Sequence, residues 1–467
     1  MLLNRLKVNC LDSDIRIKEL SPLIKSDQLR VPLKFGGVVV TDSASLIIRA
    51  TVENKRGFVS EGLGAMPLID KWAFPDPTDS HEKKLEAMIQ IGERTCKMLE
   101  MNYREKFAHP IDIMLGSKGA ILQLVREIDG DVGLRIPMPV LGTLVSTSPI
   151  DAALHDAFGR VNNICSYDGY GQKYMEHDLS FYLGSEFRGR YISDYLQSHY
   201  SERLPIFHLV GALDKLTRDE VDANDPRDGL PVSLEEWIER DGVYCLKVKL
   251  SGIDIDWDVK RTKAIADLAS EVLKGKGHDK FYLSADSNEM NPSPDATLKY
   301  LKGLKRISPL AFDNLLYIEQ PTERELTRHM FSMKDVAGLK PVLADEGVTD
   351  FESFDLALKL SWSGVAVKAC KWHSSSLLYI SSMEHRGIPY SIQDLTCPGL
   401  ALIHSASLAA RSKPLKGFEY NARQYLPFAY KEIQERHQSL FTVKDGEVIT
   451  ESLHPLGLGF AIEGLKL

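Results

Sequence analysis

The feature that most constrains the fold is a series of short apolar runs in the second half of the chain. Each run has the length of a strand and is followed by a polar segment long enough to form a helix. Continuous apolar runs that alternate with helices are typical of parallel strands covered on both faces. The runs span residues 204–210, 244–250, 281–284, 315–318, 341–344, 364–367, 389–392 and 417–420. Eight such repeats predict an α/β fold with a closed, TIM-like barrel.

An open, doubly wound sheet is the alternative, because periodicity alone does not separate it from a barrel. No Gly-x-Gly-x-x-Gly follows any of the eight runs, which disfavours a dinucleotide-binding sheet. The chain of 467 residues is long enough for one large barrel and a smaller domain. We therefore expect a barrel with a second unit built from the remaining sequence.

The composition argues against several classes of protein. The formal net charge of −8 gives no support to nucleic-acid binding, which usually shows as a basic excess. No run of about 18 apolar residues is present, so we expect no association with a membrane. Residues 1–10 lack the apolar core of a signal peptide, and the six cysteines are scattered without a Cys-x-x-Cys pair. A cytoplasmic protein with reduced thiols is the resulting expectation.

The sequence outside the barrel predicts a mixed α and β unit. Residues 45–52 predict a strand, and a turn at 54–57 connects it to a returning strand at 58–61. Helices are predicted over 82–101, capped at Asp79-Ser80, over 117–128, and from Ser148-Pro149 onward with the serine as cap. Near the end of the chain, residues 440–449 predict a hairpin around Asp445-Gly446 that returns to the N-terminal unit.

Two lysines share one face of the second predicted strand. Lys247 and Lys249 are two residues apart, so both point into the barrel if the intervening apolar residues face the helices. Neighbouring buried cations repel and lose hydration, and both effects lower the pKa of a lysine from its usual value of about 10.4. A lysine tuned in this way can act as a general base. The alternative is a pair of solvated lysines on an edge strand.

Three acidic residues, Asp286, Glu319 and Asp345, follow three successive predicted strands. The carboxyl ends of barrel strands lie at one face, so these carboxylates should converge above the barrel. Carboxylate oxygens suit Mg²⁺ or Mn²⁺, and so much negative charge in one place favours a bound cation. Lys368 ends the sixth predicted strand and so lies across the barrel from the second strand. Lys371, three residues later, is expected to have a structural role.

With these residues in order, the chain resembles the enolase superfamily, and within it the muconate-lactonizing-enzyme-like subgroup. The resemblance covers roughly residues 240–420 and rests on one motif per strand: Lys247-x-Lys249, Asp286-x-Asn288, Glu319-Gln320-Pro321, Asp345-Glu346 and Val-x-Val-Lys368. It implies a (β/α)7β TIM-like barrel over residues 148–421. It also implies an α+β capping domain formed by residues 1–147 and completed by the C-terminal tail, residues 422–467. Phe35 and Trp72 are then candidates for cap loops over the site.

The resemblance implies a role for each motif. Asp286, Glu319 and Asp345 would bind Mg²⁺, with Mn²⁺ as an alternative. The metal would bind a substrate carboxylate and stabilise the enediolate that forms when the proton α to it is removed. Lys249 would act as acid and base on one face of the substrate, and Lys247 would keep the pKa of Lys249 low. Lys368 would serve the opposite face.

Further polar residues at strand ends are candidates for substrate contacts, each with a structural role as the alternative. The last strand carries Glu419-x-Asn421, where dipeptide epimerases of the superfamily carry an Asp-x-Asp that binds the substrate ammonium. A dipeptide substrate is therefore not favoured. The candidates are His208, Asn288, Gln393, Asp394, Glu419 and Asn421.

The expected function is that of a Mg²⁺-dependent isomerase, namely a racemase, epimerase or cycloisomerase acting on a small carboxylate, and we expect a homo-oligomer. A lyase that dehydrates an acid sugar by the same first step is the main alternative. A binding protein without turnover would not require the lysines, and a metal hydrolase would require histidines at strand ends. The mandelate-racemase branch would pair a histidine with an aspartate, a pattern that His373 and Asp394 do not match.

Overall fold

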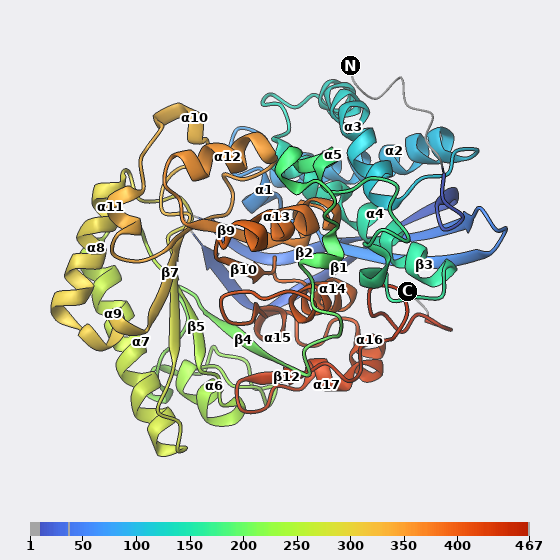
Figure 1. Ribbon diagram of the computed structural model, residues 1–467. Helices are drawn as coiled ribbons and strands as arrows, with labels where there is room; N and C mark the ends of the chain where they lie inside the picture. Colours follow the sequence, from blue (N-terminus) through green and yellow to red (C-terminus); the bar gives the residue numbers. More distant parts are fainter. Residues whose placement is uncertain (1–9, 36–37, 466–467) are drawn as a thin grey trace.

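The N-terminal part of the chain forms a three-stranded antiparallel sheet in the described residues (Figure 1). The computed structural model describes residues 10–35 and 38–465. The strands are β1 (Ile15–Phe35), β2 (Val38–Asn54) and β3 (Val59–Pro67), in the order β1-β2-β3. Residues 43–48 of β2 are all buried, so both faces of this part of the strand are covered. The predicted strands at 45–52 and 58–61, with their connecting turn, are confirmed.

Helices pack against this sheet and complete the cap. They are α1 (Asp70–Ala73), α2 (His81–Tyr103), α3 (Pro110–Val132) and α4 (Val140–Val161). The helix predicted over 82–101 is confirmed as α2. Ser80 caps it as predicted, since its side chain accepts a hydrogen bond from the Lys83 amide. The helix predicted over 117–128 lies within α3.

Helix α4 differs from its prediction. It begins at Val140, so the prediction of a helix start at Ser148 is wrong. Pro149 lies inside the helix and has no N–H to donate to the Val145 carbonyl, but the Ser148 hydroxyl donates to that oxygen at 2.9 Å instead. Helix α4 therefore runs without a break across residues 147 and 148, where the border between cap and barrel was predicted.

Strand β3 lies directly against α4. A Cβ atom at Gly64 would lie 2.1 Å from the Pro149 carbonyl oxygen, and one at Gly62 would lie 2.2 Å from the Ala157 nitrogen. Since no side chain fits in that space, glycine at these two positions permits the close approach of strand and helix. The cap is therefore held together by backbone contact as well as by its apolar core.

The following part of the described chain forms a closed barrel of eight parallel strands. Neighbouring strands pair in chain order, and β11 pairs with β4 to close the ring. The strands are β4 (Arg203–Val210), β5 (Cys245–Lys249), β6 (Tyr282–Asp286), β7 (Leu315–Glu319), β8 (Val342–Ala344), β9 (Gly364–Lys368), β10 (Tyr390–Gln393) and β11 (Phe418–Glu419). All eight predicted strands are confirmed, as is the predicted TIM-like barrel with an N-terminal cap.

Helices surround the ring, and the two segments of unusual length are mostly irregular. The helices are α6 (Leu234–Asp241), α7 (Ile255–Gly275), α8 (Pro294–Ile307), α9 (Pro309–Asn314), α10 (Leu326–His329), α11 (Lys334–Ala337), α12 (Phe351–Lys359), α13 (His373–Arg386) and α14 (Leu400–Ala410). Residues 162–202 contain the short turns η1 (Ser166–Gly169), α5 (Ser180–Leu183), η2 (Ser185–Phe187) and η3 (Ile192–Asp194), and η4 (Arg218–Glu220) precedes α6. In the described ranges, no helix combines the length and apolar character that a membrane crossing requires.

The C-terminal tail contains α15 (Ala422–Tyr425), α16 (Lys431–Arg436), α17 (Gln438–Phe441) and β12 (Glu447–Ile449). The hairpin predicted over 440–449 is wrong in its first strand, because Leu440 and Phe441 belong to α17, whereas the predicted turn at Asp445-Gly446 forms with an antiparallel bridge between Lys444 and Glu447. Strand β12 instead pairs antiparallel with the first residues of β4, which extend beyond the start of β5 and leave an edge to pair with. The tail then reaches the cap, where the Leu458 amide donates to Asp156 at 2.8 Å.

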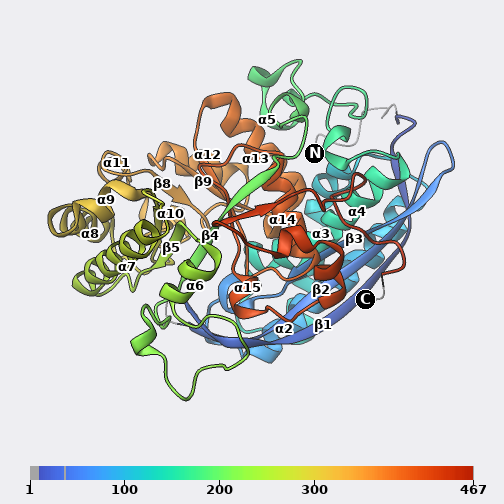
Figure 2. The ribbon, with the colours of Figure 1, turned by 90° about the horizontal axis from the view of Figure 1, so that it is seen from below.

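The cap also reaches the mouth of the barrel through its longest strands. Figure 2 shows the β1–β2 hairpin extending from the cap toward α15 and α6. Near the end of this hairpin, Arg30 forms an ion pair with Asp228 of the segment before α6 at 2.6 Å. This contact places the hairpin over the carboxyl ends of the barrel strands.

Candidate active site

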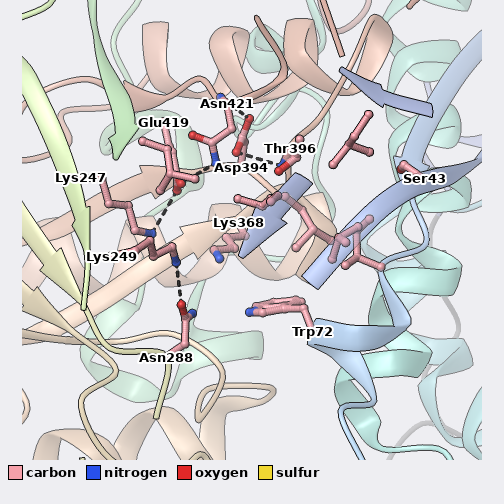
Figure 3. Close-up of a pocket in the computed structure, with 16 residues that line it drawn as sticks. Ser43, Trp72, Lys247, Lys249, Asn288, Lys368, Asp394, Thr396, Glu419 and Asn421 are labelled. Atoms are coloured by element: carbon pink, nitrogen blue, oxygen red, sulfur yellow. Dashed lines mark hydrogen bonds and ion pairs between the residues drawn. The ribbon is translucent and has the colours of Figure 1, made fainter. Parts of the chain in front are cut away.

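A cavity lies between the carboxyl ends of the barrel strands and the cap (Figure 3). The barrel supplies the charged side chains of its wall, namely Lys247, Lys249, Lys368, Asp394 and Glu419. The cap supplies mainly apolar side chains from the β1–β2 hairpin and from the segment around α1. The predicted lysines therefore share one cavity with the candidate substrate contacts.

Lys247 is buried within the ring and surrounded by acceptors. Its ammonium group lies 2.9 Å from Glu319 and 3.2 Å from both Asp286 and Glu419. Every residue of β5 is buried, so the alternative of solvated lysines on an edge strand is wrong. Burial lowers the pKa of Lys247, but the three carboxylates outweigh burial and raise that pKa well above its ordinary value. The predicted lowering of the pKa is therefore wrong for Lys247, because it counted burial and the neighbouring lysine but not the three carboxylates.

Lys249 lies two residues after Lys247, at the carboxyl end of β5. Its ammonium group lies 2.5 Å from Asp286 and donates to the Asn288 side-chain oxygen at 2.8 Å. Asn288 adopts a left-handed backbone conformation with a φ of 43°, and its amide donates to Asp286 at 2.8 Å. Asparagine tolerates this conformation better than most residues. The Asp286-x-Asn288 motif thus forms a tight turn that orients Lys249.

Lys368 enters the cavity from β9. Its ammonium group lies 2.7 Å from Asp345 and 4.5 Å from the centroid of the Trp72 ring, which belongs to the cap. Lys371 lies 3.0 Å from the other oxygen of the same Asp345 carboxylate. Lys371 is buried and does not line the cavity, in keeping with the structural role expected for it.

The backbone around Asp345 is fixed by Gln320, the middle residue of the Glu319-Gln320-Pro321 motif. The side-chain oxygen of Gln320 accepts hydrogen bonds from the amides of Asp345 at 2.7 Å and Gly347 at 3.2 Å. Gln320 also has a positive φ of 28°. The motif on β7 therefore sets the position of the acid that follows β8.

The three acids expected to bind metal are wholly buried and influence one another. Burial and the charge of Asp286 raise the pKa of Glu319 to about 8. Burial would also raise the pKa of Asp345 and of Asp286, but the charges of Lys368 and Lys249, respectively, outweigh it and hold both pKa values below the ordinary range. The pKa of each acid therefore depends on the charges of the other acids and of the lysines.

The side chains of Asp286, Glu319 and Asp345 are chemically suited to bind a divalent cation. They offer carboxylate oxygens, which Mg²⁺ prefers, and the Asp345 carboxylate is wholly buried, with the ammonium groups of Lys368 and Lys371 at its two oxygens. The Lys247 ammonium group stands between Asp286 and Glu319, so a cation already bridges two of the three acids. In the described ranges, no three acidic, histidine or cysteine side chains are arranged as a finished metal site. Lysine ammonium groups contact each of the three carboxylates instead.

The structure brings four of the predicted substrate contacts to the cavity wall: Asn288, Asp394, Glu419 and Asn421. Gln393 lies beneath the wall, where it donates to Glu319 at 2.5 Å and accepts from Lys247 at 3.0 Å. His208 does not reach the cavity. Its neighbour Leu209 lines the cavity, so His208 points to the other face of β4, against Arg423 and Gln424.

Asp394 holds the loop that follows β10 through hydrogen bonds to its backbone. Its carboxylate accepts hydrogen bonds from the amides of Thr396, Cys397 and Asn421 at 3.0, 3.3 and 3.2 Å. Burial and the charge of Glu419 raise the pKa of Asp394 to about 7. His373 lies in α13 and contacts Tyr170 and His404, so the structure does not pair it with Asp394.

Sequence reasoning missed the apolar part of the wall. Leu29, Leu33 and Val40 reach the cavity from the cap hairpin, and Ile69 precedes α1. Apolar cap residues carry no local signal of a site, because only the packing of cap on barrel brings them there. Trp72 lines the cavity as expected of a cap loop residue, whereas the Phe35 side chain lies outside the described part of the structure.

The sequence matches one protein family over half of its length. The profile of the family described as “Enolase C-terminal domain-like” matches residues 230–464. No curated protein sequence gives a match.

Solved structures share the whole fold at low sequence identity. The N-succinyl Arg/Lys racemase from Bacillus cereus ATCC 14579 is 17% identical, with a TM-score of 0.59, and covers 96% of this chain and 95% of that chain. The muconate lactonizing enzyme from Pseudomonas fluorescens, complexed with muconolactone, is 15% identical, with a TM-score of 0.58 and coverage of 96% of both chains. The dipeptide epimerase from Enterococcus faecalis V583, complexed with Mg and L-Leu-L-Tyr, is 16% identical, with a TM-score of 0.57 and coverage of 95% and 99%.

Proposed function

The chain belongs to the enolase superfamily, and we propose that it falls in the muconate-lactonizing-enzyme-like subgroup and is a Mg²⁺-dependent enzyme that removes the proton α to a substrate carboxylate. The observation that carries this proposal is the pair of buried lysines on opposite sides of one cavity. Lys249 ends β5 and Lys368 ends β9, and these strands are four positions apart in the closed ring of eight. A substrate carbon between them would face an amine on either side.

The three acids would hold the metal. Asp286, Glu319 and Asp345 supply the carboxylate oxygens, and a Mg²⁺ bound there would neutralise the substrate carboxylate and the negative charge that develops on proton loss. The dipeptide epimerase with a similar fold is complexed with Mg, which supports the choice of ion. Mn²⁺ has the same ligand preference and is the alternative.

The side chains of this chain would divide the remaining tasks. Lys249, held by Asp286 and Asn288, would take up or return the α proton on one face. Lys368, placed between Asp345 and Trp72, would do so on the other face or stabilise the developing charge. Lys247 lies deeper, so it would act on the carboxylates around it. The cap over the cavity would exclude water during the reaction.

A lysine on each face supports an isomerase. Racemisation or epimerisation would use both Lys249 and Lys368 for proton transfer, whereas cycloisomerisation would use one of them. A lyase that dehydrates an acid sugar would begin with the same proton removal and is the alternative reaction. Membership of the superfamily further supports a homo-oligomer. It also supports a division of the chain into a cap of residues 1–147 and 422–467 and a barrel of residues 148–421.

Exchange of the α proton with solvent tests this proposal. The full chain with Mg²⁺ is incubated in D₂O with a set of carboxylates, and deuterium at the α carbon is measured by NMR or mass spectrometry. We expect wash-in that falls by at least about 100-fold in Lys249→Met and Lys368→Met, since a positioned acid or base contributes about this much. The partly exposed Lys263, which forms an ion pair with Asp267 on the same helix α7, gives the control variant Lys263→Met. A substrate that turns over with full retention of its α hydrogen would reject the mechanism.

A further inference from the structure

The wall of the cavity also indicates what the substrate carries besides its carboxylate. We infer that the substrate is a carboxylate with an otherwise uncharged, mainly apolar body and one hydrogen-bond donor directed at Asn421. The inference rests on the proposed function, because it takes the lysine end of the cavity as the place of the reacting carboxylate.

Charge in the cavity wall is confined to the barrel side. In the described residues, the charged side chains of the wall are Lys247, Lys249, Lys368, Asp394 and Glu419, and the cap contributes none. Both acids belong to the barrel: Glu419 lies on β11 and contacts Lys247 and Asn421, and Asp394 follows β10 and accepts three backbone hydrogen bonds. A second charge on the substrate would therefore be buried on the cap side without a counterion, which is strongly unfavourable.

The cap side of the wall is aliphatic. Leu33 and Val40 from the hairpin pack with Leu209 of β4 and Tyr425 of α15 in one buried cluster, which Leu29 joins from its edge. Burying an apolar substrate body against this surface removes it from water and so favours binding. The hydroxyl groups of an acid sugar would lose their hydration there without finding enough partners, because Ser43 supplies the one hydroxyl among the wall residues from the hairpin.

In the described residues, two polar side-chain atoms of the wall are buried without a hydrogen bond: the Ser43 hydroxyl oxygen and the Asn421 side-chain oxygen, which can only accept. The Asn421 side-chain nitrogen donates to Glu419 at 2.7 Å, and Glu419 in turn contacts the Lys247 ammonium group. A carboxylate can only accept, so the amide nitrogen of Asn421 must face Glu419 and its oxygen must face away. That oxygen is buried without a hydrogen bond, and only 4% of the residue is exposed. A substrate N–H or O–H at this point would satisfy it.

Binding measurements with four carboxylates test the substrate class. The Mg²⁺-loaded full chain is titrated by calorimetry with N-acetyl-L-leucine, its ester isostere (S)-2-acetoxy-4-methylpentanoate, N-acetyl-L-glutamate and D-gluconate. We expect N-acetyl-L-leucine to bind at least about tenfold more tightly than the other three, which lack the donor, add a charge or add hydroxyls. Tighter or equal binding of D-gluconate or N-acetyl-L-glutamate would overturn the inference.

Two pairs of variants locate the effect. Val40→Thr adds a hydroxyl to the apolar wall at nearly constant volume and should weaken the binding of N-acetyl-L-leucine by about tenfold. Val39→Thr is the matched control, because Val39 is the next residue on the same strand and is exposed to solvent. Asn421→Ala should abolish the preference for N-acetyl-L-leucine over its ester isostere. A preference that persists at the wild-type level in Asn421→Ala would contradict the assigned donor contact.

Binding and proton exchange separate the inference from the proposed function. If the apolar carboxylates bind in the expected order but no carboxylate exchanges its α proton, the proposed function fails and the inference about the cavity holds. If exchange is found with D-gluconate and not with the apolar carboxylates, the proposed function holds and the inference fails.

Discussion

Replacing Lys247 by methionine should destabilise the chain strongly in the absence of metal. Methionine keeps the length of the side chain but removes the ammonium group that lies within 3.2 Å of three buried carboxylates. Removing one partner of a buried ion pair costs about 3–5 kcal/mol, because the remaining charges stay desolvated without compensation. For a chain of 467 residues, whose entropy of unfolding is about 1 kcal/mol/K, such a loss should lower the Tm by about 3–5 °C.

Calorimetric unfolding in EDTA and in Mg²⁺ measures this effect. If Mg²⁺ binds among the same carboxylates, it should restore part of the lost stability, so Mg²⁺ should raise the Tm of Lys247→Met more than that of the wild type. Lys263→Met is the control, since Lys263 lies on the surface and its replacement should leave the Tm nearly unchanged. A Lys247→Met variant as stable as wild type in EDTA, or one that Mg²⁺ does not stabilise further, would refute this reasoning.

Two further predictions concern stability. Burial and the charge of Asp345 raise the pKa of Glu346 from 4.5 to about 7, so the stabilisation from its neutral form is complete below pH 4.5 and is lost as the pH rises through 7. The Tm of the wild type in EDTA should therefore fall between pH 5 and pH 8 by more than that of Glu346→Gln; an identical pH dependence would contradict this assignment. Gly64→Ala should lower the Tm by at least about 3 °C, because its Cβ would lie 2.1 Å from the Pro149 carbonyl oxygen. Gly119→Ala on α3 has open space and should not lower the Tm, so equal effects of the two alanines would contradict the packing argument.

The parts of the fold that could be predicted from the sequence are those encoded locally. Each barrel strand is a short apolar run, because parallel strands are buried on both faces. The order of the site residues followed from the same pattern, since the carboxyl ends of the strands share one face of the barrel. Lys249, Asp286 and Lys368 therefore lie at one cavity although they are far apart in the chain.

The predictions that failed depend on contacts between distant segments. The predicted start of α4 is wrong because the Ser148 hydroxyl replaces the hydrogen bond to the Val145 carbonyl that Pro149 cannot donate. The sequence pattern does not reveal this replacement. Strand β12 pairs with the free edge of β4 rather than with a neighbour in sequence, so its partner could not be read locally. The raised pKa of Lys247 arises from Glu419 and Glu319 as well as from Asp286, and these charges meet only when the ring closes.

Anomalous diffraction from crystals soaked in Mn²⁺ tests the central claim most directly, since Mn²⁺ shares the oxygen ligands of Mg²⁺ and its position can be identified from its own signal. The account predicts one peak in the cavity, within about 2.3 Å of oxygens from Asp286, Glu319 and Asp345, with Lys249 and Lys368 on either side of it. A peak bound by other residues, or a cavity without a peak while the protein binds Mn²⁺ elsewhere, would contradict it.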